Sequence, residues 1–256
     1  MVEFLNVIDQ LLKKVLEETL KIKSEKSDCQ KFYYEILFIN IRLFEGAIFL
    51  LAQFEKKPLF QVSFVSVMRD LISNLILADY ISYSEFDPSV NVDEELEKIY
   101  SEHYRFKKKS KKIERTLFNI YEDHAQFEEE FDKLGERYNG EGGGLKPHLK
   151  KIESTFNRIK YIESQQKKDD KYNVRVLYNW YTEFSKISHF GELTIRQVAN
   201  KYNLKNEKEV FDNYGHLLKT VSIYIVGLLA KVCYKEPVEE SIVKNLYKIR
   251  DFEIGT

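Results

Sequence analysis

The feature that most constrains this chain is a heptad pattern in its middle. From Val92 to Tyr138, the residues that would share one side of a helix alternate in steps of four and three, as in helices that pack along a seam. A single unbroken helix of this length would extend for ~70 Å, and its seam would need another helix to cover it. The pattern therefore predicts helix-on-helix packing. Its members are Val92, Leu96, Ile99, His103, Phe106, Ser110, Ile113, Leu117, Ile120, His124, Phe127, Phe131, Leu134 and Tyr138.

A glycine-rich segment at residues 140–144 follows the seam. We therefore expect residues 92–169 to form a long antiparallel, coiled-coil-like hairpin with the glycine-rich turn at its tip. The second arm is the shorter one, so part of the first arm must pack on the rest of the protein or on another subunit. In that second arm the same spacing resumes at Leu145, Leu149, Ile152, Phe156 and Ile159.

The rest of the chain is also predicted to be helical. Apolar residues recur in steps of three and four, and no convincing alternating strand is present. The stretch from residue 28 to 57 is apolar nearly all round and is expected in the middle of a bundle. The fold class is thus all-α: residues 1–91 and 170–256 form a helical-bundle body into which the hairpin is inserted. The expected helices of the body span residues 2–24, 28–57, 60–83, 170–190, 194–203, 206–234 and 237–252.

Composition narrows the class of protein. Hydrophobic residues make up 43% of the chain and aromatic residues 14%, which excludes a wholly disordered protein. Only 10 glycines and 4 prolines argue against a β-sandwich or barrel, and a net charge of -1 excludes a generally polycationic binder. Two cysteines, Cys29 and Cys233, make neither a disulfide framework nor a zinc site. With no signal peptide and no membrane-spanning stretch, we expect a reduced cytoplasmic protein without membrane contact.

A basic stripe and an acidic block follow one another in the heptad region. Lys108, Lys111, Lys112 and Arg115 share one side of the predicted helix, where they would form a nucleic-acid-binding track along phosphates. The acidic block lies at residues 122–132. The alternative is a solvated coiled-coil surface whose opposite charges pair with an antiparallel partner. RNA therefore stays open as a partner beside another protein.

Charged and polar residues also interrupt the predicted core. Arg42 with Glu45, and Arg69 with Asp70, are expected to form structural ion pairs, or else to face a cleft. His103, Ser110 and His124 would set the register of the heptad seam. No ligand pair has the helical spacing that a metal site needs, so we expect no metal and no cofactor.

A row of hydroxyl groups ends in a histidine on one predicted helix. Tyr178, Tyr181, Ser185 and His189 follow one another in steps of three, four and four. Free carbonyl groups at the end of this helix would favour the charged imidazolium of His189, which could act as an acid or base or bind an anion. The alternative is that His189 only caps its own helix.

Two of these segments resemble an uncharacterised bacterial all-helical family. Residues 64–72 are similar to the family's arginine-bearing apolar helix, and residues 181–189 to its Tyr-x-x-x-Ser-x-x-x-His helix. The family pattern has Glu four residues after the arginine, where this chain has Ser73, so Asp70 or Glu45 would have to replace it.

Such bundles are loosely similar to HEPN-type proteins, many of which are metal-independent ribonucleases of bacterial defence and toxin systems. Their Arg-x(4–6)-His motif is absent here, so the resemblance implies that Arg69 and His189 meet from separate helices. His189 would then deprotonate a ribose hydroxyl and Arg69 would stabilise the phosphorane, with Tyr181 and Ser185 beside them.

Two functions remain open, and a third is weaker. The heptad pattern favours an interaction or scaffold protein that forms a homo-oligomer, or binds a partner protein, through its hairpin. The alternative is a HEPN-like ribonuclease or RNA-binding effector that uses Arg69 and His189. The third is a DNA-binding helix-turn-helix beginning at residues 194–204, although the helix after it opens with acidic residues.

Overall fold

The computed structural model confirms the all-α fold class. In the part of the chain that it describes, every regular element is a helix, and the only β feature is an isolated antiparallel bridge between Asn139 and Leu145. The described residues are 1–20, 28–54, 60–85, 87–118, 125–140, 145–149, 154–166, 174–188, 207–235 and 244. The predicted helices at residues 194–203 and 237–252 lie outside them.

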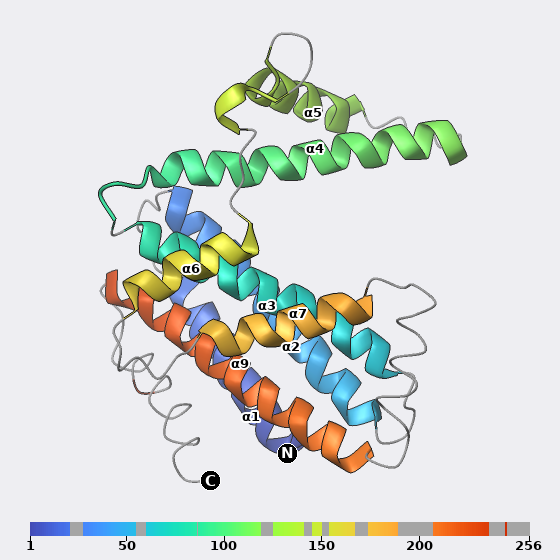
Figure 1. Ribbon diagram of the computed structural model, residues 1–256, viewed down its shortest axis with the longest axis vertical. Helices are drawn as coiled ribbons and strands as arrows, with labels where there is room; N and C mark the ends of the chain where they lie inside the picture. The colour runs from blue at the N-terminus through green and yellow to red at the C-terminus, as the bar shows by residue number, and fades with distance from the viewer. Residues whose placement is uncertain are drawn as a thin grey trace. The chain divides into compact units, whose positions relative to one another are not determined.

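The chain divides into two compact units, whose helices are labelled in Figure 1. The second unit, Ser84–Ser154, contains α4 (Val92–Phe118), α5 (Ala125–Tyr138) and the short 3₁₀ helix η1 (Pro147–Leu149). Helix α6, which we expected in the hairpin, belongs to the first unit. That unit comprises Met1–Tyr83 and Thr155–Thr256, with α1 (Val2–Leu20), α2 (Asp28–Phe54), nearly all of α3 (Phe60–Ser84), α6 (Thr155–Gln165), α7 (Val174–Ser188) and α9 (Glu207–Lys235).

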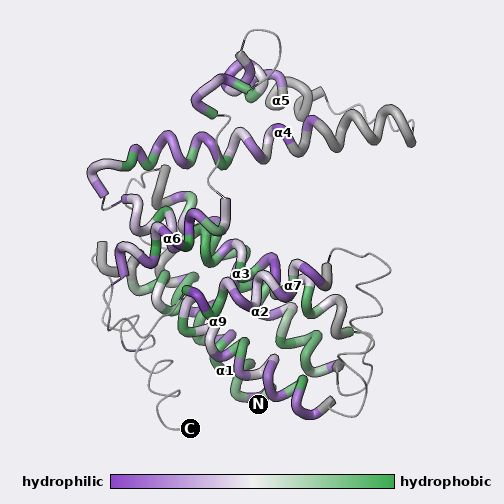
Figure 2. The backbone as a smooth tube through the Cα atoms, in the orientation of Figure 1, coloured by the Kyte–Doolittle hydropathy of each residue, from purple (hydrophilic) through white to green (hydrophobic). Residues whose placement is uncertain are grey.

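Helices α1, α2 and α9 pack against one another in the first unit. Each turns a stripe of apolar side chains inward at helical spacing, as the sequence predicts for amphipathic helices. Figure 2 shows these apolar segments along the three helices, in contrast to the largely hydrophilic α4. The side chains that solvent scarcely reaches include Leu5, Ile8 and Leu12 of α1, Leu37, Ile41 and Phe44 of α2, and Leu218, Val221 and Ile225 of α9.

An aromatic cluster fastens α3 and α7 to α9. The ring of Phe64 on α3 stacks on Tyr214 of α9, with centroids 4.5 Å apart. Phe184 of α7 meets the same tyrosine edge-on at 6.1 Å. All three rings are buried, and burial of an aromatic side chain is among the largest single contributions to a core. The cluster thereby fixes which side of α7 faces outward.

In the second unit α5 folds back onto α4, so the heptad region does not form one straight arm. The rings of Tyr104 and Tyr138 have centroids 5.8 Å apart, and the Asn139 side-chain amide donates to the Tyr104 hydroxyl at 3.1 Å. A continuous helix would hold residues 104 and 138 ~50 Å apart. Helix α5 therefore lies against α4 rather than continuing it. The heptad pattern did not reveal this, because two halves of one seam cover each other equally well when the chain doubles back.

A second reversal spans the glycine-rich segment. Asn139 and Leu145 pair across it, and the Lys146 N–H donates to the Tyr138 carbonyl at 3.0 Å. The chain then enters η1, whose Leu149 is fully buried with the two tyrosines of α4 and α5. The second unit thus has a small buried core of its own, to which α4, α5 and η1 each contribute a residue.

Helix α2 departs from the expected central position. It packs on α1 and α9, but its other side is open to solvent, with Phe38 48%, Ile39 47% and Phe49 60% exposed. A stretch that is apolar all round predicts burial, but it does not say whether the covering surface belongs to the same chain. The prediction of a central helix was therefore wrong on this side.

Candidate functional site

An ion-pair network runs across the surface between α1 and α2. The Lys13 ammonium lies 2.7 Å from Asp9 Oδ2 on its own helix and 2.7 Å from Glu45 Oε1 on α2. The Arg42 guanidinium reaches the other oxygen of Glu45 at 3.2 Å. Asp9 is the buried member, and among the described residues no donor reaches its Oδ1 atom. The network joins the two helices and holds the Glu45 carboxylate between two cations.

The pKa values of the network members are shifted by different causes. Burial raises the pKa of Asp9, and the nearby Lys13 offsets only part of that rise. Hydrogen bonds from Lys13 and then from Arg42 lower the pKa of Glu45, whose own burial opposes them. Burial alone would lower the pKa of Lys13, but its two carboxylate partners together raise it. The contacts of this network join α1 to α2 and hold the Glu45 carboxylate in a fixed position.

The apolar residues exposed on α2 surround this network. Phe38, Ile39, Arg42, Glu45, Gly46 and Phe49 recur at helical spacing on the outer side of the helix, and we call this set the α2 face. The Arg42 guanidinium lies 5.5 Å from the centroid of the Phe38 ring. A side chain added at Gly46 would meet nothing within 4 Å. Contiguous exposed apolar residues with a charged centre are typical of a protein contact surface.

A second exposed surface lies on α6 and α7. Its rings are Phe156, Tyr178 and Tyr181, which we call the aromatic row. Phe156 is 48% exposed, and the two tyrosines are half-buried. The sequence singled out Tyr178 and Tyr181 for their hydroxyl groups but assigned Phe156 to a buried seam. Spacing alone carries no signal for this, because Phe156 lies three residues before the buried Ile159 and only the packing of α6 turns it outward.

The residues proposed for catalysis are only partly described. Arg69 donates from Nε and Nη2 to Asp70 Oδ1, at 3.0 and 2.7 Å. The predicted pairs Arg69–Asp70 and Arg42–Glu45 are thus confirmed as ion pairs, but both lie at the surface rather than in the bundle interior. Tyr181 and Ser185 lie one turn apart on α7, and no hydrogen bond among the described residues joins either to Arg69. His189 lies outside the described residues, so its meeting with Arg69 stays a prediction.

The lysine stripe lies on α4 of the second unit. Lys108 is exposed, with its ammonium 6.0 Å from the centroid of the Tyr104 ring. Lys111, Lys112 and Arg115 follow on the same helix, with side chains outside the described set. The stripe therefore stays a candidate nucleic-acid track that rests on its spacing alone.

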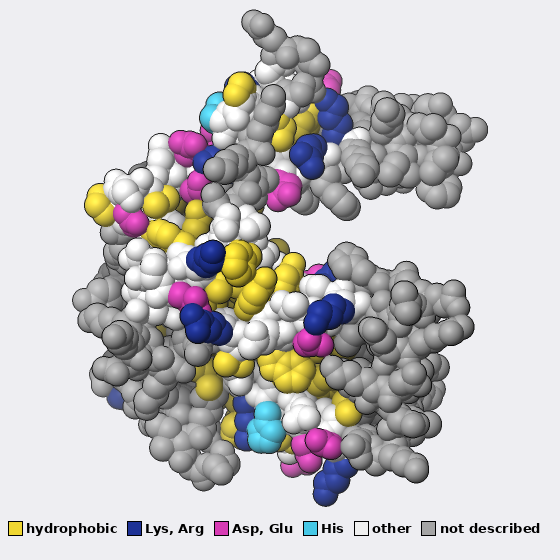
Figure 3. All heavy atoms as spheres, viewed as in Figure 1, with side chains coloured by type: hydrophobic (Ala, Val, Ile, Leu, Met, Phe, Trp, Pro, Cys, Tyr) yellow, Lys and Arg dark blue, Asp and Glu magenta, His cyan; other side chains and the backbone are white. Residues whose placement is uncertain are grey.

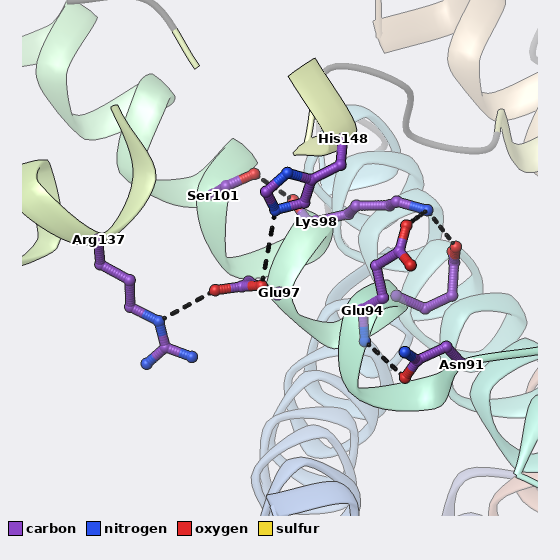
Figure 4. Close-up of polar contacts among 8 residues, drawn as sticks. Asn91, Glu94, Glu97, Lys98, Ser101, Arg137 and His148 are labelled. Atoms are coloured by element: carbon purple, nitrogen blue, oxygen red, sulfur yellow. Dashed lines mark hydrogen bonds and ion pairs between the residues drawn. The ribbon is translucent and has the colours of Figure 1, made fainter. Parts of the chain in front are cut away.

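The described polar contacts of the second unit hold its helices together, as Figure 4 shows. Glu97 on α4 accepts from Arg137 of α5 at 3.3 Å and lies 4.0 Å from His148 of η1. Lys98 bridges Glu94 and Glu95 at 2.9 and 2.7 Å. Asn91 accepts the Glu94 N–H at the start of α4, as a helix cap does. The buried Ser101 hydroxyl donates to the Lys98 carbonyl at 2.8 Å within the same helix.

Comparisons of the chain with protein-family models, curated proteins and solved structures found no match. The fold and surfaces by themselves define an all-α protein of two units with exposed apolar side chains. In the described ranges no helix is long and apolar enough to cross a membrane. Those ranges also contain no group of three or more His, Cys, Asp or Glu side chains placed to hold a metal ion.

Proposed function

We propose that the protein is an interaction or scaffold protein that self-associates, and that the α2 face is its contact surface. The observation that carries this proposal is the exposure of Phe38, Ile39 and Phe49 on one side of a single helix. Large apolar side chains that gather on one face are more typical of an assembly surface than of a free monomer.

The α2 face is complementary to itself. Arg42 follows Phe38 by four residues, and Glu45 precedes Phe49 by four. If two copies of α2 pack antiparallel about a two-fold axis midway between these residues, Phe38 meets Phe49 of the second copy, and Arg42 meets its Glu45. A two-fold contact needs this reciprocity, in which each residue pair occurs twice. Gly46 lies close to the axis and has no side chain to keep the two backbones apart.

The hairpin predicted from the heptad pattern has less exposed apolar surface for a second copy to cover. Tyr104, Tyr138 and Leu149 bury one another within the second unit, so part of the apolar surface of α4 is covered by its own chain. Leu134 of α5 is 37% exposed and is the residue through which hairpin-mediated assembly can be tested. The α2 face and the exposed side of α5 would both give self-association, and they differ only in the helix that forms the contact.

Light scattering of the full-length chain over a range of concentrations tests the proposal. We expect a dimer that dissociates in Phe49→Glu, because the new charge would have to be buried against an apolar partner. Phe156→Glu is the matched control, since Phe156 is a similarly exposed phenylalanine outside the α2 face, and it should leave the mass unchanged. Circular dichroism should show both variants folded.

Three outcomes separate the alternatives. A dimer lost in Leu134→Glu and kept in Phe49→Glu would move the contact to the second unit, as the heptad pattern suggests. A chain that is monomeric at every concentration would overturn self-association altogether. A mass that falls equally in all three variants would indicate a general loss of folding and contradict the assignment of the contact to α2.

The ribonuclease alternative is tested separately. It requires RNA cleavage in the absence of metal, and this cleavage should disappear in His189→Ala. Arg69→Lys is a useful companion variant, because lysine keeps the charge but cannot make the two hydrogen bonds that the guanidinium donates to Asp70 Oδ1. Cleavage that survives in His189→Ala would remove that histidine from the mechanism.

A further inference from the structure

We propose that the aromatic row on α6 and α7 binds single-stranded nucleic acid by stacking with its bases. The row consists of Phe156, Tyr178 and Tyr181, with the ammonium group of Lys160 beside it. This inference does not depend on the α2 face or on self-association.

The three rings form a continuous row that crosses from one helix to the next. The ring centroids of Phe156 and Tyr178 lie 6.2 Å apart at an interplanar angle of 43°. Those of Tyr178 and Tyr181 lie 6.3 Å apart at 19°, a stacked arrangement. The chain therefore presents successive π-surfaces with nearly even spacing, as proteins do that bind unpaired bases without strong sequence preference.

The row is not part of the core that holds α6 and α7 in place. Helix α6 buries Ile159 and Ile162, and α7 buries Val174, Leu177 and Phe184. These residues anchor the two helices, so the aromatic row is additional apolar surface. Figure 3 shows apolar side chains on this face of the molecule, with Lys and Arg side chains and a few acidic ones around them. Apolar rings that reach solvent beside an already buried core are a reason to infer a ligand.

The charge beside the row favours a phosphate-bearing ligand. The Lys160 ammonium lies 4.5 Å from the centroid of the Phe156 ring, and no carboxylate of the described chain forms an ion pair with it. Two neighbouring cations are already neutralised, since Arg175 donates to Glu163 and Lys186 to Glu183. Lys160, at the exposed end of the row, is thus available for a backbone phosphate.

A single strand fits this surface better than a duplex. In a duplex both faces of each base are covered by its neighbours, so stacking on protein rings requires bases that are already unpaired. The rings supply stacking area, and stacking by itself tolerates any base because every base has a π-face. We therefore expect binding that depends on strandedness and salt more than on sequence.

Fluorescence anisotropy tests this inference with two labelled probes, an oligouridylate of about 12 nucleotides and a blunt RNA duplex of the same length. At low salt the wild-type protein should bind the single strand more tightly than the duplex. Tyr178→Ala should weaken single-strand binding by roughly tenfold, the effect of losing one stacked base. Tyr178→Phe is the matched control and should bind within about twofold of wild type, because it keeps the ring.

A second variant tests the phosphate contact. Lys160→Ala should reduce the slope of log affinity against log salt by about one unit, as expected for one phosphate contact. Binding that Tyr178→Ala leaves unchanged would overturn the stacking site, and a loss of binding in Lys108→Ala instead would assign it to the stripe on α4. A protein that binds neither probe, or prefers the duplex, would also overturn it. Light scattering tests self-association separately, so neither experiment decides the outcome of the other.

Discussion

Two glycines inside helices should respond in opposite ways to an added methyl group. A Cβ at Gly227 of α9 would meet nothing within 4 Å, so Gly227→Ala should gain the helix propensity of alanine without a clash. We expect the free energy of unfolding to rise by about 1 kcal/mol, measured by urea denaturation. A Cβ at Gly135 of α5 would lie 3.0 Å from the Tyr104 hydroxyl and 3.4 Å from the Asn139 amide nitrogen.

Gly135→Ala should therefore give no comparable gain. Its methyl group would push apart the two groups that share a 3.1 Å hydrogen bond between α4 and the end of α5. The propensity gain would then be offset by the weakened contact. Equal stabilisation by both substitutions would show that the Tyr104–Asn139 contact does not restrict this glycine.

Two carboxylates of the α1–α2 network should give opposite pH dependences. The pKa of Asp9 is raised by burial, so its contribution to stability is full below the unfolded value and is lost as the pH rises through the folded one. The pKa of Glu45 is lowered, first by its hydrogen bond from Lys13, so its contribution is present above the unfolded value and is lost as the pH falls.

Urea denaturation of two variants between about pH 3 and pH 7 measures this difference. Relative to wild type, Asp9→Asn should become more stable as the pH rises, because wild type alone pays the cost of ionising a buried group. Glu45→Gln should become less stable over the same range. If both differences follow the same trend, the assignment of the two shifts is wrong.

At the residue scale, sequence spacing could predict pairs on one helix but not pairs between helices. Arg42 with Glu45, and Arg69 with Asp70, are close in sequence, and their pairing followed from that alone. Lys13 reaches Glu45 across two helices, which requires knowledge of how α1 and α2 pack. The aromatic row was missed at Phe156 for the same reason, because its outward position depends on how α6 packs.

At the scale of helices, the contact between α4 and α5 should depend on one aromatic ring. Tyr104 packs on Tyr138 and accepts a hydrogen bond from Asn139. Tyr104→Ala should cost about 3 kcal/mol by removing a buried ring. Tyr104→Phe keeps the ring and should cost about 1 kcal/mol for the lost hydrogen bond. Chemical denaturation monitored by circular dichroism would show both, and equal costs would mean that the ring packing adds little.

The heptad pattern shows what periodicity could predict at this scale. It predicted helices over the residues that form α4 and α5, since a repeat of 3.5 residues has few other solutions. It left the packing of α5 back onto α4 undetermined, because a seam covered by its own chain and one covered by another helix carry the same pattern. The seam member Leu96 is buried as predicted, while the buried Tyr104 lies next to the seam rather than in it.

At the scale of the whole molecule, the all-α class and a body built from both ends of the chain followed from composition and periodicity, whereas the boundaries of the two units did not. Helix α6 continues the spacing of the heptad region and was assigned with it, yet it belongs to the unit built from the two ends of the chain. Contacts between residues far apart in sequence decide to which unit a helix belongs. The ring of Tyr80 on α3 meets Tyr161 of α6 at 5.4 Å, a contact between residues far apart in sequence.

The two units should respond separately to damage, because each has its own buried core. Tyr104→Ala removes a ring from the core of the second unit, and Leu37→Ala removes a fully buried side chain from the first. In hydrogen exchange of the full chain, Tyr104→Ala should reduce the protection of α4 and α5 while α1, α2 and α9 keep theirs, and Leu37→Ala should do the reverse. Local opening of one unit leaves the amides of the other in intact helices. Uniform loss of protection in both variants would instead show that the units unfold as one cooperative body.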